Sequence, residues 1–205
     1  MEAIAAALNR IAIWLKAQHP QGYETLQPGL NRQEIENKVI SLQLPEEFYE
    51  LYQWRNGTHY GKTLYAEEIF FGASLTPLVG GFFIEPEESA RDYNCVFMFK
   101  RDEYAMVLDL NRWETENLQF PPLAMFWTNT EEPYIEKIVF NNLSGMMLAL
   151  AEAMETKACW VKNNSDLVGD REKLKLIHQK YNSGCEEGFS KWLSWWLSGK
   201  VDGLA

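Results

Sequence analysis

The sequence has little of the chemistry from which metal sites and disulfide frameworks are built. Its cysteines are Cys95, Cys159 and Cys185, and its three histidines are equally scattered. An odd number of distant cysteines does not indicate a disulfide framework, and no cysteine or histidine pair has the spacing of zinc ligands. We therefore expect no metal and no cofactor, in a protein of a reducing compartment, the cytoplasm.

Long apolar runs are also missing. No stretch of 18 apolar residues occurs, so the sequence predicts no membrane-spanning segment. Residues 1–16 carry Glu2 before any positive charge and lack a continuous apolar segment, which is not the pattern of a signal peptide.

Positive charge is scarce. The chain has 19 lysines and arginines against 29 acidic residues, a net charge of −10 at pH 7. This balance argues against binding to nucleic acid and against docking on anionic lipid. Two interpretations remain: the charge attracts a basic protein partner, or it only keeps the protein soluble.

Catalytic motifs are absent too. The sequence has no Gly-x-Ser-x-Gly, no phosphate loop, no dinucleotide fingerprint and no His-Glu-x-x-His. His59 lies in a predicted loop without a visible partner, so we interpret it as a surface group. The sequence predicts a protein that is not an enzyme. A hydrolase that uses carboxylates from acidic loops is the alternative.

What the sequence does contain is an ordinary core composition, with 46% hydrophobic and 14% aromatic residues. Periodicity predicts helices over residues 2–18, 31–42, 45–55, 143–158, 170–182 and 189–197. It predicts strands over residues 95–99, 104–110, 123–127 and 134–140. Residues 58–94 read as irregular chain and residues 162–169 as a polar linker. Separate blocks of helices and strands indicate an α+β fold, with helices packed on a curved, mainly antiparallel sheet and extra helices at both ends of the chain.

Several helix ends carry specific signals. Asn31 and Glu34 have the spacing of a capping box. Pro45 suits the first position of the next helix, and Asn56-Gly57 supplies a left-handed stop after it. Pro20 predicts the end of the first helix.

A family resemblance lies in the segment around the predicted helix 45–55. It consists of Leu-Pro, acidic residues, an aromatic helix and then Asn-Gly. The residues that carry it are Leu44, Pro45, Glu46, Phe48, Tyr52, Trp54, Asn56 and Gly57.

This segment resembles the N-terminal signature of the SUKH superfamily, which includes bacterial immunity proteins and the yeast cell-wall assembly regulator. The resemblance covers about residues 30–158 and implies one SUKH-like domain over residues 1–205, with residues 160–205 as a C-terminal helical extension. It implies an α+β fold without metal or nucleotide. It also implies a protein-binding role, either neutralising a cognate toxin or acting as a regulator or scaffold without a toxin partner.

Candidate contacts to a partner are acidic pairs in predicted loops and one tryptophan. The acidic candidates are Glu67, Glu68, Glu131 and Glu132, which would face a basic toxin domain. The tryptophan is Trp195, in the Trp-rich segment Phe189 to Leu197. This segment docks on the domain and completes its core, or presents its rings to a partner. Insertion into a membrane interface is a third and weaker option, because the segment carries only one lysine, Lys191.

Overall fold

The computed structural model describes residues 2–39, 42–59, 68–78, 94–101, 104–127, 134–163 and 166–198. Its helices are α1 (Glu2–Gln18), α2 (Pro20–Thr25), α3 (Arg32–Lys38), α4 (Glu46–Trp54), α5 (Leu110–Thr115), α6 (Leu143–Glu155), α7 (Arg171–Tyr181) and α8 (Glu186–Ser198). Its strands are β1 (Leu26–Pro28), β2 (Arg55–Thr58), β3 (Ser74–Leu75), β4 (Cys95–Arg101), β5 (Tyr104–Asp109), β6 (Leu123–Trp127), β7 (Tyr134–Phe140), β8 (Cys159–Lys162) and β9 (Asp166–Gly169).

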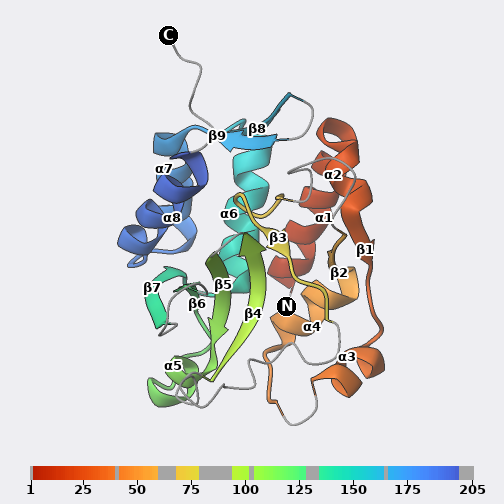
Figure 1. Ribbon diagram of the computed structural model, residues 1–205, viewed down its shortest axis with the longest axis vertical. Helices are drawn as coiled ribbons and strands as arrows, with labels where there is room; N and C mark the ends of the chain where they lie inside the picture. Colours follow the sequence, from red (N-terminus) through yellow and green to blue (C-terminus); the bar gives the residue numbers. More distant parts are fainter. Residues whose placement is uncertain are drawn as a thin grey trace.

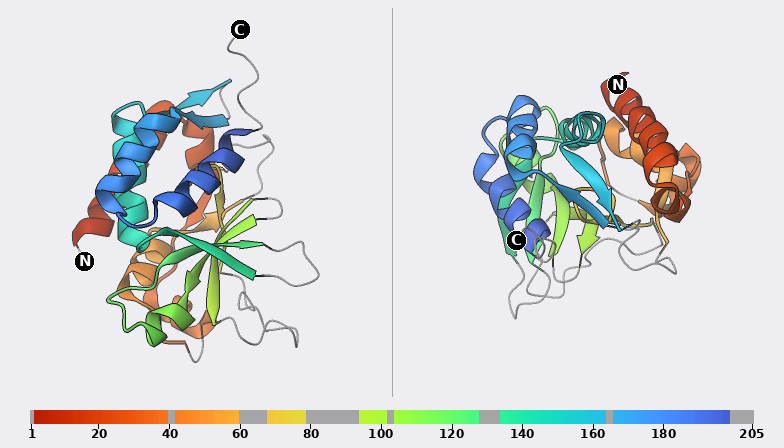
Figure 2. Two further views of the ribbon diagram at one scale, coloured as in Figure 1. Left: turned by 90° about the vertical axis from the view of Figure 1, so that its left-hand side faces the viewer. Right: turned by 90° about the horizontal axis from the view of Figure 1, so that it is seen from above.

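The main sheet is an antiparallel meander with the strand order β3-β4-β5-β6-β7. Two antiparallel pairs, β1-β2 and β8-β9, form separate two-stranded sheets. Helix α6 runs between α1 and the α7–α8 pair, and these helices lie together on one side of the sheet (Figures 1 and 2). The predicted α+β class with a mainly antiparallel sheet is confirmed.

One continuous apolar core joins the two ends of the chain to its middle. Ile4 and Leu8 of α1 are buried in the same cluster as Met147 and Leu150 of α6. Trp192 of α8 is fully buried there as well. The Trp-rich helix therefore docks on the sheet and completes the core, which is the first of its three interpretations.

The second helix begins as its sequence predicts. Asn31 Oδ1 accepts a hydrogen bond from Glu34 N at 2.9 Å, and Glu34 Oε2 accepts one from Asn31 N at 2.7 Å. This is a complete capping box, so the prediction is confirmed.

The first helix ends as predicted, since α1 stops at Gln18 before Pro20. Pro20 then opens the unpredicted short helix α2, because proline is also favoured at a first helical position. Two other predictions are wrong. Pro45 is the N-cap residue of α4, one position before the first helical residue. The polar linker predicted over 162–169 is in fact part of the β8–β9 hairpin, whose strands pair from Cys159↔Gly169 to Lys162↔Asp166.

Asn56 and Gly57 do not form the predicted helix stop. Helix α4 ends at Trp54, and both residues lie in strand β2. Gly57 does have a positive φ of +85°, but it serves a close approach to Pro77, since a Cβ on Gly57 would lie 2.5 Å from Pro77 Cα. The left-handed conformation was predicted correctly and its structural purpose was not.

The segment Tyr52–Thr58 makes hydrogen bonds and a close packing contact with the short edge strand β3 and with the residues after it. Tyr52 Oη donates to Thr76 O at 2.8 Å, and Thr58 Oγ1 donates to Leu75 O at 3.1 Å. Asn56 Oδ1 accepts from Leu78 N at 2.9 Å. We call these three hydrogen bonds and the Gly57–Pro77 contact the β3 clamp.

The opposite edge strand, β7, is covered by the C-terminal helices. His178 Nε2 lies 2.6 Å from Val139 O, and Asn141 N donates to Asn182 Oδ1 at 3.1 Å. Gly188 of α8 faces Ile138 O so closely that a Cβ would overlap it. Open sheet edges invite unwanted pairing, and these contacts occupy backbone groups that another strand would otherwise bind.

We predict that Gly57→Ala destabilises the protein by at least about 2 kcal/mol, because the side chain adds both backbone strain and a clash with Pro77. Gly184→Ala is the matched control: Gly184 has a similar φ of +91°, but a Cβ there would meet nothing within 4 Å. Strain alone should cost Gly184→Ala about 1 kcal/mol. Urea unfolding of both variants measures the difference, and equal losses would contradict the clamp.

Candidate functional site

One end of the sheet carries a row of large side chains. Arg101, Tyr104, Trp127 and Tyr134 are successive Cα partners across β4, β5, β6 and β7. Directly opposed residues of an antiparallel sheet point to the same face. The meander thus brings four strand ends together.

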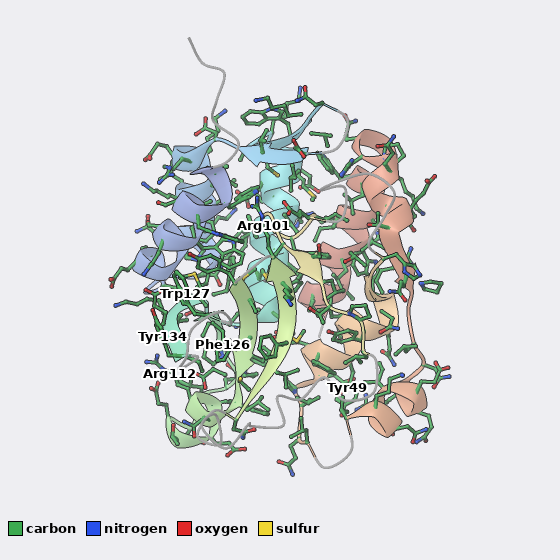
Figure 3. The ribbon with its side chains drawn as sticks, in the orientation of Figure 1. Tyr49, Arg101, Arg112, Phe126, Trp127 and Tyr134 are labelled. Carbon is green, nitrogen blue, oxygen red and sulfur yellow. The ribbon has the colours of Figure 1, made fainter. Side chains whose placement is uncertain are left out.

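The ring of Trp195, in helix α8, packs against this row of side chains. Its ring centroid lies 4.5 Å from that of Tyr104, and Tyr104 lies 4.3 Å from Trp127. Trp127 and Tyr134 have centroids 6.4 Å apart and planes inclined by 12°. We call Tyr104, Trp127, Tyr134 and Trp195 the aromatic row. Trp127 and Tyr134 are labelled in Figure 3.

The aromatic row changes from buried to exposed along its length. Trp195 rests on the fully buried Trp192, at a centroid distance of 4.8 Å. Tyr104, Trp127 and Trp195 are partly buried, whereas Tyr134 is 40% exposed. The inner rings hold α8 on the sheet, and the outer end faces solvent.

A buried ion pair lies at the Trp195 end of the aromatic row, which we call its inner end. Arg101 Nε lies 3.1 Å from Glu68 Oε1, with side-chain exposures of 12% and 8%. The Arg101 guanidinium also lies 4.8 Å from the centroid of the Trp195 ring. The sequence placed Glu68 in a loop as a contact for a basic partner. Instead, the carboxylate is buried and its charge is balanced within the molecule.

Further ion pairs flank the outer half of the row. Trp127 Nε1 donates to Glu136 Oε2 at 2.7 Å, and Lys191 of α8 pairs with the other oxygen of Glu136. Lys137 pairs with Glu187 at 3.1 Å. Each of these cations is matched by a carboxylate, and the contacts again tie β7 to α8.

Of the partner contacts predicted from the sequence, Trp195 and Glu68 lie close together in the structure. Trp195 is part of the aromatic row, and the Arg101 side chain contacts both its ring and the Glu68 carboxylate. Glu67, Glu131 and Glu132 lie outside the described residues. Tyr104, Trp127 and Tyr134 were missed, although each stands at the end of a predicted strand, where hairpin pairing would have aligned them.

The residues of the Leu44–Gly57 segment lie away from this row and serve the fold. Phe48 and Tyr52 are fully buried, and Glu46 accepts a bond from Arg32 Nη1 at 2.6 Å. The others are Leu44 and Trp54, which pack on the core, Pro45 at the N-cap of α4, and Asn56 and Gly57 in the β3 clamp.

A cavity of about 390 Å³ lies at the other end of β7, between α5 and the loop before α8. Arg112 and Glu116, which line it, pair with each other at 2.7 Å. Cys185 Sγ donates to Asn141 Oδ1 at 3.0 Å. Burial and the nearby Glu186 carboxylate raise the pKa of the Cys185 thiol to about 11, so this thiol is protonated and poorly nucleophilic at neutral pH.

No alternative centre emerges in the part of the chain that the structure describes. Within those residues, no group of three histidine, cysteine or acidic side chains is arranged to hold a metal ion. None of the helices found there combines the length and apolar character needed to cross a bilayer. His59 is exposed, and its backbone N–H donates to Thr25 O at 2.7 Å.

His178 connects α7 to the end of β7 that is opposite to the aromatic row. Its ring stacks on Phe189 of α8 at a centroid distance of 3.9 Å and lies 5.3 Å from Phe140 of β7. Burial lowers the pKa of His178, an effect that its bond to Val139 O and the Glu186 carboxylate partly oppose. The neutral ring therefore donates from Nε2 to Val139 O at neutral pH.

We predict that the Glu68–Arg101 pair is coupled. Glu68→Gln leaves the Arg101 charge largely buried without its counter-charge, which should cost about 3 kcal/mol of unfolding free energy. Arg101→Met should cost a similar amount. The double variant should lose clearly less than the two single losses combined, by at least about 1 kcal/mol in a double-mutant cycle. Additive losses would show that the two side chains act independently.

We predict that His178 makes the protein less stable in mild acid. The pKa of histidine in an unfolded chain is about 6.5, and the pKa of folded His178 is lower. The unfolded chain thus binds more protons, so stability is complete above about pH 6.5 and falls as the pH drops toward the folded pKa.

His178→Gln keeps an N–H donor and removes the titration. Its unfolding free energy should fall less than that of the wild type between about pH 7 and about pH 5. His59→Gln, at an exposed loop position, controls for the removal of a histidine. Wild-type and His178→Gln curves with the same slope in this range would rule out the assignment.

The chain matches no protein-family model and no curated protein sequence. The assignment of a site therefore stands on the geometry of the aromatic row itself.

Proposed function

We propose that this protein is a non-enzymatic, protein-binding member of the SUKH superfamily that neutralises a cognate toxin through the aromatic row. The observation that carries the proposal is the row itself: aromatic side chains from three strands and α8 converge at one end of the sheet and lead out to solvent.

The chemistry of the row supports a protein partner. Tryptophan and tyrosine are enriched among the residues that dominate binding energy at protein interfaces. Their rings bury a large apolar area while losing few rotamers. Ion pairs flank the row, and protein interfaces likewise combine aromatic residues with a polar rim.

The kinship rests on the segment Leu44–Gly57 and on the order of elements after it. The segment forms helix α4 and enters β2, and the antiparallel strands β4 to β7 and helix α6 follow. This is the order that the resemblance implies. Within this segment, Phe48 and Tyr52 are buried in the core and Gly57 makes a close approach to Pro77, so these residues have structural roles in the fold.

The charge and the cysteines support the rest of the proposal. A net charge of −10 attracts a basic toxin domain and speeds its capture at low salt. Cys95, Cys159 and Cys185 are buried free thiols, as suits a protein that works in the reducing cytoplasm.

Co-expression with toxins encoded next to its gene tests the function. The wild-type protein should restore growth of cells that produce the cognate toxin. Tyr134→Ala should bind that toxin about 30-fold more weakly, because removal of a dominant interface side chain costs about 2 kcal/mol. Isothermal titration calorimetry measures this loss.

Trp160→Ala is the matched control, since Trp160 is 45% exposed but lies in the β8–β9 hairpin, away from the row (Figure 1). It should bind as the wild type does. A toxin that kills equally with and without this protein would disprove that pairing. A partner that is captured from the host but is no toxin would favour the regulator or scaffold role.

A further inference from the structure

We infer that the outer half of the aromatic row, Trp127 and Tyr134, receives arginine side chains of the partner protein. The inference rests on the proposed function and names the chemistry by which the same surface recognises its partner.

The protein already binds its own guanidinium groups in this way. Arg101 lies 4.8 Å from the Trp195 ring centroid and pairs with Glu68. At a second place, Arg32 lies 4.3 Å from the Tyr49 ring centroid and donates to Glu46 at 2.6 Å. In both cases a guanidinium covers an aromatic face and still reaches a carboxylate. A planar cation can do both at once.

The outer half of the row offers the aromatic component in two neighbouring rings, beside the Glu136 carboxylate, whose two oxygens already bind Trp127 Nε1 and Lys191. Trp127 presents an aromatic ring whose N–H is bonded to the Glu136 carboxylate, and Tyr134 stands beside it with 40% of its surface exposed. Donation to a carboxylate leaves the indole richer in electrons, which strengthens its attraction for a cation. Among the described residues, no arginine or lysine lies over either of these two rings.

The electrostatic setting favours a cation from outside. Lys191 and Lys137 are neutralised by Glu136 and Glu187, so the nearest cations present little repulsion. The whole chain carries a net charge of −10, which attracts a basic segment. Arginine is preferred over lysine because a guanidinium is less strongly hydrated and stacks flat on a ring.

Fluorescence anisotropy with three labelled hexapeptides tests the inference. The peptides are hexa-arginine, hexa-lysine and hexa-citrulline, the last of which keeps the planar group without its charge. Hexa-arginine should bind most tightly, hexa-lysine several-fold more weakly, and hexa-citrulline not measurably.

Three variants locate the binding. Tyr134→Leu, which keeps an apolar side chain but removes the ring, should weaken hexa-arginine binding by about two- to five-fold. Tyr134→Phe keeps the ring and should bind as the wild type does. Trp160→Leu, at the exposed tryptophan of β8, should leave binding unchanged. Urea unfolding confirms that each variant is folded.

Equal binding of hexa-arginine and hexa-lysine would overturn the inference, because net charge alone would explain it. So would undiminished binding by Tyr134→Leu, equal weakening by Trp160→Leu, or no binding of hexa-arginine. These failures differ from failure of the proposed function. A toxin neutralised by the wild type but not by Tyr134→Ala, together with no arginine preference, would keep the function and reject the arginine chemistry.

Discussion

The architecture depends on the β3 clamp, through which residues Tyr52–Thr58 hold the segment 74–78. Strand β3 has only two residues, Ser74 and Leu75, which is too short to fix its own position on β4. The clamp supplies three hydrogen bonds from α4 and β2, and at Gly57 it brings the two backbones together at a distance that no other residue type allows. Because α4 also packs on α1 and α6, the clamp joins the N-terminal helices to the sheet edge.

The two edges of the sheet are closed by opposite ends of the chain. The β3 edge is held by the N-terminal part, and the β7 edge is covered by α7 and α8 through His178, Asn182 and Gly188. Strand addition at either edge would have to displace these contacts. The aromatic row lies at one end of the strands, where the strand register positions it and Tyr134 is 40% exposed.

Features that depend on neighbouring residues could be predicted from the sequence. The Asn31 capping box and the strands β6 and β7 are local patterns, and the structure reproduces them. Features that depend on distant partners could not. Gly57 was assigned to a helix stop because Pro77 is not its neighbour in sequence, and Glu68 was assigned to solvent because its counter-charge belongs to Arg101. For the same reason only Trp195 of the row was anticipated: alignment of the other three rings required the register of two hairpins.

The gradient of burial along the row would link binding of the proposed partner to the stability of the fold. The rings form one chain of contacts from the core residue Trp192, through Trp195, Tyr104 and Trp127, to Tyr134 at the surface. The inner members hold α8 on the sheet, so a substitution there alters docking of the helix as well as any interface. A partner that contacts both Tyr134 and the docked helix α8, as proposed, would bind only the state in which α8 is docked. By linkage it must stabilise that state, by an amount that grows with the logarithm of its free concentration above the dissociation constant. The same packing of α8 that completes the core thus also supports Trp127 and Tyr134 at the surface.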